Sequence, residues 1–131
     1  MNRRLFLLST AAFVPSIAIA YPAETFTPDI WRTLRESDRT VILNYRASWS
    51  ITCQIKADLI AEALADTPEY ANLTFVDVDW DTFGRAVLTE RLKVTRRSTL
   101  LVMKNGKEVA RLVNEPYARR VRALLDTALA A

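Results

Sequence analysis

Residues 41–53 read VILNYRASWSITC, an apolar run followed by a short polar turn that ends in the only cysteine of the chain. Residues 41–45 are rich in β-branched and apolar types, which predicts a buried strand. Ser50 is a favoured residue for a helix N-cap, and the apolar residues beyond it recur at helical spacing as far as Pro68. The stretch therefore predicts a strand that passes through a turn into a helix starting at Ser50. The apolar face expected of that helix comprises Ile55, Leu59, Ile60, Ala63 and Leu64.

The rest of the chain predicts three more strands and three more helices. Strands joined by a helix are expected to be parallel, with a right-handed crossover. The pair Asn105-Gly106 is a strong hairpin signal, which adds an antiparallel edge. The expected fold is α/β, a four-stranded mixed sheet with helices on both faces. The further elements are helices over 28–36, over 83–92 and from Pro116 onward, and strands over 73–79, 99–103 and 108–113.

The composition excludes several classes of site. Half of the 131 residues are apolar and a quarter are charged, which is typical of one globular domain. The lack of histidine excludes a His-based catalytic triad, and a single cysteine excludes an intramolecular disulfide or a multi-cysteine metal site. The acidic residues Asp77, Asp79 and Asp81 have no further ligand pattern beside them, so we expect no metal and no cofactor.

The first twenty residues have the pattern of an export signal. Arg3 and Arg4 precede an apolar run, residues 5–20, that ends in the small-x-small sequence Ala18-Ile19-Ala20. We expect cleavage after residue 20, which leaves a mature domain of residues 21–131 in the periplasm without stable membrane insertion. The arginine pair fits a twin-arginine signal as well as the general secretory route. The alternative is an uncleaved N-terminal membrane anchor.

The charge balance does not point to a nucleic-acid partner. The chain has 18 basic and 15 acidic residues, and two of the basic residues belong to the expected export signal. No basic stripe with interleaved aromatic residues is present in the sequence, and such a stripe is typical of nucleic-acid binding.

Three segments together resemble the thioredoxin family. They are the sequence from Ala47 through Trp49 to Cys53, the strand Thr99-Leu100-Leu101-Val102, and the turn Lys104-Asn105-Gly106, in the family's order and spacing over residues 27–131. The resemblance implies a thioredoxin-like fold and thiol–disulfide chemistry on protein partners. In that family a Cys-x-x-Cys motif supplies an attacking and a resolving cysteine. Here the attacking position is Ser50, and the resolving position is Cys53.

Further positions depart from the family's pattern. Asn44 stands where the family has a buried aspartate that carries a proton, and an amide cannot take one. Ser98 stands where the family has a cis-proline, so we expect a trans bond there, because a cis bond before another residue costs about 3 kcal/mol. The family's glycine after the hairpin is replaced near Asn114. These changes argue against a self-sufficient dithiol oxidoreductase.

Two functional hypotheses remain open from the sequence. The first is a degenerate, single-thiol protein that engages thiols or disulfides of partner proteins through Cys53, with Ser50 as the helix cap. The first turn of a helix and Lys56 favour the thiolate, whereas burial opposes it. The second is a non-catalytic protein- or peptide-binding module in which Cys53 is structural. The face expected for either function comprises Trp49, Ser50, Cys53, Trp80, Arg97, Ser98 and Thr99.

Overall fold

A computed structural model describes residues 21–131, so the predicted export signal lies outside the described residues. The sheet has the strand order β1-β3-β2-β4-β5. The strands are β1 (Glu24–Thr25), β2 (Thr40–Arg46), β3 (Thr74–Asp79), β4 (Thr99–Lys104) and β5 (Lys107–Val113). The helices are α1 (Pro28–Arg35), α2 (Ile51–Asp66), α3 (Trp80–Phe83), α4 (Val87–Arg91) and α5 (Ala118–Leu129), with a 3₁₀ turn over Pro68–Asn72.

The sheet is mixed, as the sequence predicts, but it has five strands rather than four. β2 lies at its centre, parallel to β3 and antiparallel to β4, and β5 extends it through the hairpin. Asn105 and Gly106 both have positive φ, 52° and 74°, as a tight hairpin turn of this sequence requires. The additional strand, β1, is parallel to β3 and only two residues long, too short to leave a periodic sequence pattern.

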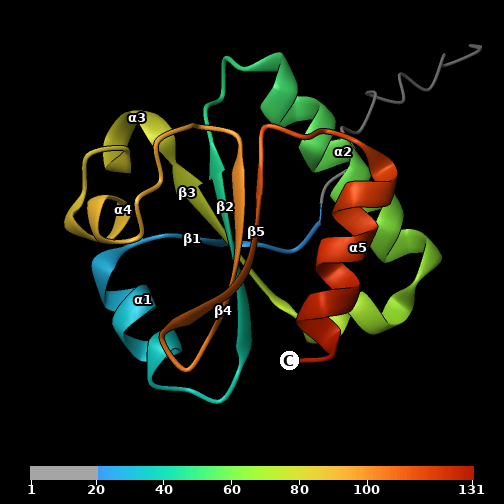
Figure 1. The fold of residues 1–131 in the computed structure, drawn as a ribbon, viewed down its shortest axis with the longest axis horizontal. Helices are drawn as coiled ribbons and strands as arrows, with labels where there is room; N and C mark the ends of the chain where they lie inside the picture. The colour runs from blue at the N-terminus through green and yellow to red at the C-terminus, as the bar shows by residue number, and fades with distance from the viewer. Residues whose placement is uncertain (1–20) are drawn as a thin grey trace, which may run out of the picture.

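Helices cover both faces of the sheet, and each face has its own core. Figure 1 shows α2 and α5 on one side and α1, α3 and α4 on the other. Alternate residues of β2 serve the two cores: Ile42 packs with Ile60 and Leu125 under α2 and α5. Leu43 and Tyr45 pack on the opposite side, with α1. The central strand is therefore buried on both faces, which explains its continuous apolar sequence.

The predicted helix over 83–92 is shorter than expected, α4 over Val87–Arg91, and a separate helix that was not predicted, α3 over Trp80–Phe83, precedes it. The carboxylate of Asp79 caps α3 by accepting a hydrogen bond from the Thr82 amide at 3.2 Å. Gly84 then ends α3, and a Cβ at that position would lie 2.6 Å from the carbonyl oxygen of Trp80. Ala86 has extended backbone, and α4 starts after it. The last helix also differs, because α5 begins two residues after Pro116 with Tyr117 as its N-cap.

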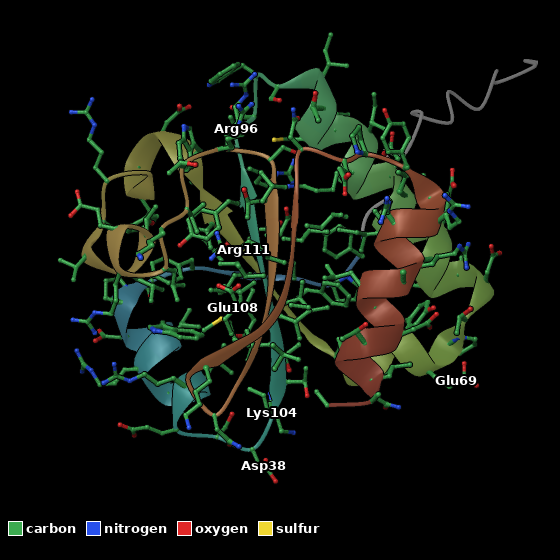
Figure 2. The ribbon with its side chains drawn as sticks, in the orientation of Figure 1. Asp38, Glu69, Arg96, Lys104, Glu108 and Arg111 are labelled. Atoms are coloured by element: carbon green, nitrogen blue, oxygen red, sulfur yellow. The ribbon has the colours of Figure 1, made fainter. Side chains whose placement is uncertain are left out.

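The topology brings three segments to one end of the sheet. β2 ends there and leads through a turn into α2, and β3 ends beside it and leads into α3. Because β4 is antiparallel to β2, the loop that precedes Thr99 reaches the same end. Figure 2 shows Arg96, from that loop, at this end, and Lys104 with Asp38 at the opposite end. The predicted functional residues come from these three segments.

Candidate functional site

Cys53 lies in the first turn of α2 with its side chain against the sheet. Ser50 is the N-cap, as predicted, and its Oγ accepts a hydrogen bond from the Cys53 amide at 3.3 Å. The cysteine side chain is 1% exposed. Its Sγ accepts a hydrogen bond from the Ala47 amide at 3.5 Å, and as a thiol it donates to the Arg97 carbonyl oxygen at 3.9 Å. The sulfur is thus held between the end of β2 and the loop before β4.

The groups around the sulfur favour its ionised form. Burial raises the pKa of the Cys53 thiol, and this is the largest single influence. Hydrogen bonds from the hydroxyl of Ser50 and from the Ala47 amide, the charge of Lys56 and a hydrogen bond from Ser98 act in the opposite direction and together outweigh it. The pKa of Cys53 therefore lies below its ordinary value, in the direction that increases the thiolate fraction at neutral pH.

Lys56 is buried one turn further along α2, which the sequence analysis missed. Its side chain is 3% exposed, and its Nζ donates a hydrogen bond to the Tyr45 carbonyl oxygen at 2.9 Å. Burial lowers the pKa of Lys56 to about 8, because the charged form loses its hydration. The sequence contained a signal for this position: Cys53, Lys56, Ala57 and Ile60 follow helical spacing. Those residues form the buried face, and the expected assignment of Ile55 to it is wrong, since Ile55 is exposed.

Beneath the site, Asn44 is completely buried in a polar network. Its Nδ2 donates to the Tyr21 hydroxyl at 2.6 Å and to Oδ1 of Asp77 at 3.2 Å. Tyr21 also donates to that carboxylate, at 3.0 Å, and Arg46 pairs with the other carboxylate oxygen at 3.4 Å. Burial raises the pKa of Tyr21, so its hydroxyl stays protonated. Asp77 faces Asn44 across the β2–β3 register, so the carboxylate of this network lies on β3 and not on β2.

One atom of this network has no partner in the described part of the chain. The Oδ1 of Asn44 is buried and accepts no hydrogen bond there. The amide orientation is nevertheless set, because exchanging its oxygen and nitrogen would place the oxygen against the carboxylate of Asp77. Asn44 therefore acts as a donor to its neighbours and has no proton to exchange at neutral pH.

The rim of the site exposes a fixed aromatic side chain. Trp49 is 60% exposed, yet its Nε1 donates to both carboxylate oxygens of Asp81, at 3.2 and 3.0 Å. The guanidinium carbon of Arg97 lies 4.7 Å from the centre of the same ring, a cation–π contact. Ile51, two residues on, is 78% exposed. These contacts tie the turn before α2 to α3 and to the loop before β4.

The other predicted residues lie beside this rim. Trp80 is partly buried, with its ring edge-on to Tyr45 at 6.3 Å between centroids. Ser98 and Thr99 are both buried, and the Thr99 hydroxyl donates to the Arg96 carbonyl oxygen at 2.7 Å.

All peptide bonds in residues 21–131 are trans, as expected at Ser98. An open, polar hollow of 470 Å³ lies at this end, and its lining comprises Trp80, Thr95, Arg96, Arg97, Ser98 and Asn114.

The structure thus brings the predicted residues to one end of the sheet in two layers. Trp49 and Arg97 form the exposed layer, whereas Ser50, Cys53, Ser98 and Thr99 lie beneath it. Within residues 21–131, no group of three or more acidic or cysteine side chains is placed to hold a metal ion. None of the helices described there is long and apolar enough to cross a membrane.

Comparison with known proteins agrees with this geometry. The family model for thioredoxin matches residues 22–127. The chain belongs to the thioredoxin family. Thioredoxin-1 of Saccharomyces cerevisiae is 32% identical over 91 residues, which cover 70% of this chain and 84% of that protein. The predicted membership of the thioredoxin family, based on residues 47–53 and the two later segments, is therefore confirmed.

Solved structures agree with the thioredoxin fold. The protein Trxlp of Edwardsiella tarda superposes with a TM-score of 0.67 at 25% identity, covering 80% of this chain and 96% of that one. The thioredoxin of Malassezia sympodialis gives a TM-score of 0.69 at 19% identity, covering 83% and 95%. Membership of this family gives the site a context of thiol–disulfide chemistry on proteins.

Proposed function

We propose that this thioredoxin-family protein is an exported single-thiol protein whose Cys53 forms mixed disulfides with partner proteins. The observation that carries the proposal is the set of donors around one sulfur. Ser50, the Ala47 amide and Ser98 all favour the thiolate of Cys53 and lower its pKa. The thiolate is the reactive form in thiol–disulfide exchange.

The exchange needs no oxidant from this chain. The Cys53 thiolate attacks one sulfur of a partner's disulfide, the partner's S–S bond breaks, and a new S–S bond joins Cys53 to that sulfur. The partner's other sulfur leaves with the electron pair as a thiolate. Because Cys53 is the only cysteine, an external thiol must release the adduct. Ser50 has no base to activate it and serves as a cap and a donor to the sulfur.

The Cys53 sulfur is buried, and a partner's disulfide must reach it. Cys53 is 1% exposed, behind the turn that carries Ser50 and the exposed Ile51. The proposal therefore requires the first turn of α2 to open, which breaks the hydrogen bond between the Ser50 hydroxyl and the Cys53 amide. Openings of this kind at helix ends are among the least costly in a folded domain.

A mass measurement on the folded protein tests the proposal. The chain is incubated with a small aromatic disulfide and with a peptide disulfide, and the intact mass is recorded with time. We expect one adduct per chain, on Cys53, and none in Cys53→Ala. An adduct that forms only after addition of denaturant contradicts the proposal and makes Cys53 a structural residue.

A second function, a non-catalytic binding module, is favoured by a different observation. The side chains that are exposed at the site are Trp49 at 60% and Ile51 at 78%, whereas the sulfur is buried. In that case partner binding survives in Cys53→Ala and falls in Trp49→Ala and in Arg97→Ala. Under the single-thiol function, Cys53→Ala abolishes covalent capture of the partner.

Export to the periplasm is part of the proposal and rests on residues 1–20. The arginine pair, the apolar run and the small-x-small ending support a cleaved signal. Expression with the native N-terminus, followed by cell fractionation and N-terminal sequencing, tests it. We expect a periplasmic protein that starts at Tyr21. A full-length chain in the membrane fraction would instead support the N-terminal anchor.

A further inference from the structure

Lys56 is a buried ammonium group without a carboxylate beside it. Its Nζ has one hydrogen bond, to the Tyr45 carbonyl oxygen, and no ion pair involves it among residues 21–131. Burial of an unpaired charge is costly, so such a group either loses its proton or has a counter-charge close by. A lysine at this position of a helix that otherwise buries small and apolar residues is therefore a candidate for a functional role.

Cys53 and Lys56 both contact the backbone of residues 45–47. They are three residues apart on α2, a spacing that places side chains on one side of a helix. The sulfur accepts a hydrogen bond from the Ala47 amide, and Nζ donates to the Tyr45 carbonyl oxygen. Positions 45 and 47 are separated by about 7 Å along a strand. The two side chains thus approach each other at the end of β2.

We propose that Lys56 is the proton partner of Cys53, a positioning residue for the mixed-disulfide reaction. Once the pair has lost one proton, the remaining proton lies on the amine rather than on the sulfur: the S–H bond breaks, an N–H bond forms on the neutral amine, and a thiolate–ammonium pair results. No other reactant is needed. The use of this pair in thiol–disulfide exchange rests on the proposed function, whereas the pair itself does not.

The surrounding charges leave the thiolate as the main counter-charge of Lys56. Arg46 on β2 opposes the ammonium and Asp77 on β3 favours it, but these two residues pair with each other at 3.4 Å. Tyr21, which lies before β1, donates to Asp77 and keeps its proton because burial raises its pKa. Asn44 has no proton to exchange. The proton partner of the cysteine in this chain is therefore an amine on α2 and not a group on β2.

The titrations of Cys53 and Lys56 depend on each other. Burial lowers the pKa of Lys56 to about 8, and the neighbouring Cys53 thiolate acts against that shift. The pKa of Cys53 is itself lowered, in part by Lys56. Two groups coupled in this way lose their protons in two steps that belong to the pair.

Titration of the thiolate tests the proposal without the need for a partner. The ultraviolet absorbance of the thiolate is followed against pH in the full chain, with Cys53→Ala subtracted as the blank. Lys56→Met keeps the volume and removes the charge, Lys56→Arg keeps a charge that does not titrate, and Lys104→Met is the matched control. Lys104 also donates its Nζ to a backbone carbonyl oxygen, that of Asp38, at the opposite end of the sheet (Figure 2).

We expect the thiolate midpoint in Lys56→Met to rise by about one unit, which is a tenfold smaller thiolate fraction at neutral pH. Lys56→Arg should keep the low midpoint and lose the second step, because arginine does not titrate in this range. Lys104→Met should titrate as the unmodified protein does. A titration of Lys56→Met that coincides with that of the unmodified protein, with the native circular dichroism retained, overturns the proposal.

Failure of the proton-partner proposal and failure of the mixed-disulfide function give different results. If the midpoint shifts in Lys56→Met but the unmodified protein forms no adduct with disulfides, the proton pair stands and the mixed-disulfide function fails. If adducts form equally fast in Lys56→Met and in the unmodified protein over the whole pH range, the function stands and Lys56 is not the proton partner.

Discussion

The two layers of the site differ in how far their side chains are buried and in how their charged groups are stabilised. The buried layer includes Cys53, and beside it Lys56 and Asn44 are also at most 3% exposed, so that an ammonium group lies where apolar atoms would be more stable. The exposed layer, Trp49 with Arg97 and Asp81, is held by contacts that water weakens. We propose that the buried layer sets the ionisation of the sulfur and that the exposed layer sets which partners approach it. The predictions below separate these two contributions.

The largest expected effect is the complete loss of covalent chemistry in Cys53→Ala. No other residue of the chain has a thiol, so no disulfide adduct should appear by intact mass. Trp49→Ala should still react with a small disulfide at the original rate and react more slowly with a protein disulfide. Equal rates of reaction of Trp49→Ala and of the unmodified protein with the protein disulfide would mean that the exposed layer does not recognise partners.

Lys56→Met is expected to stabilise the fold. At neutral pH the free energy of unfolding should rise by about 2 kcal/mol, because the variant no longer buries an ammonium. The pKa of Lys56 is about 8 in the folded chain against 10.5 as its ordinary value. The folded state therefore binds fewer protons than the unfolded state between these two values, and the stability of the unmodified protein should rise with pH across that interval.

Urea unfolding from neutral to alkaline pH measures this effect. The advantage of Lys56→Met should be fully present below about pH 8 and disappear as the pH approaches 10.5. The control, Lys104→Met, should show no such convergence, because the hydrogen bond of Lys104 is at an exposed site. A loss of stability in Lys56→Met at neutral pH would show that the ammonium is well compensated in the folded chain.

Ser50→Ala is expected to affect both stability and the thiol. Loss of the N-cap should cost about 1 kcal/mol in the free energy of unfolding, and loss of the hydroxyl should raise the pKa of Cys53. Thr27→Ala is a matched control, since Thr27 caps α1 through a hydrogen bond from the Ile30 amide at 3.1 Å. That variant should lose similar stability and leave the Cys53 titration unchanged. An unchanged pKa in Ser50→Ala would restrict Ser50 to its cap role.

The smallest effects on stability are expected in the exposed layer. Trp49→Ala and Arg97→Ala should each change the free energy of unfolding by less than about 1 kcal/mol, because their mutual contact is largely exposed. Both should weaken binding of a protein partner. Val87→Ala, at an exposed apolar residue of α4, is the control and should leave partner binding unchanged. Isothermal titration with a captured partner and urea unfolding measure the two quantities.

The sequence predicted most elements because their signals are local. The Ser50 cap and the Asn105-Gly106 turn specify their own conformations, and the structure confirms them. The separate helix α3 was missed, because its four residues are too few to show a helical period, and the close approach of Gly84 to the Trp80 carbonyl oxygen does not show in a pattern.

The buried half of the site was harder to predict, because it depends on which strands pair and in which register. The proximity of Asp77 to Asn44 follows from the β2–β3 register, and the contribution of Tyr21 comes from a segment before the first predicted element. The burial of Lys56 could have been predicted from the helical spacing of Cys53, Lys56 and Ile60. Its hydrogen bond to Tyr45, however, required the position of α2 on the sheet.

The most direct test of the central claim is the pH dependence of the reaction of Cys53 with a small disulfide in the folded chain. We predict a rate that follows an apparent pKa below the value of about 8.5 for a free cysteine. The same profile in denaturant should return to that ordinary value. Reaction that is absent from the folded chain at every pH and appears only on unfolding would contradict the claim and leave Cys53 as a structural residue.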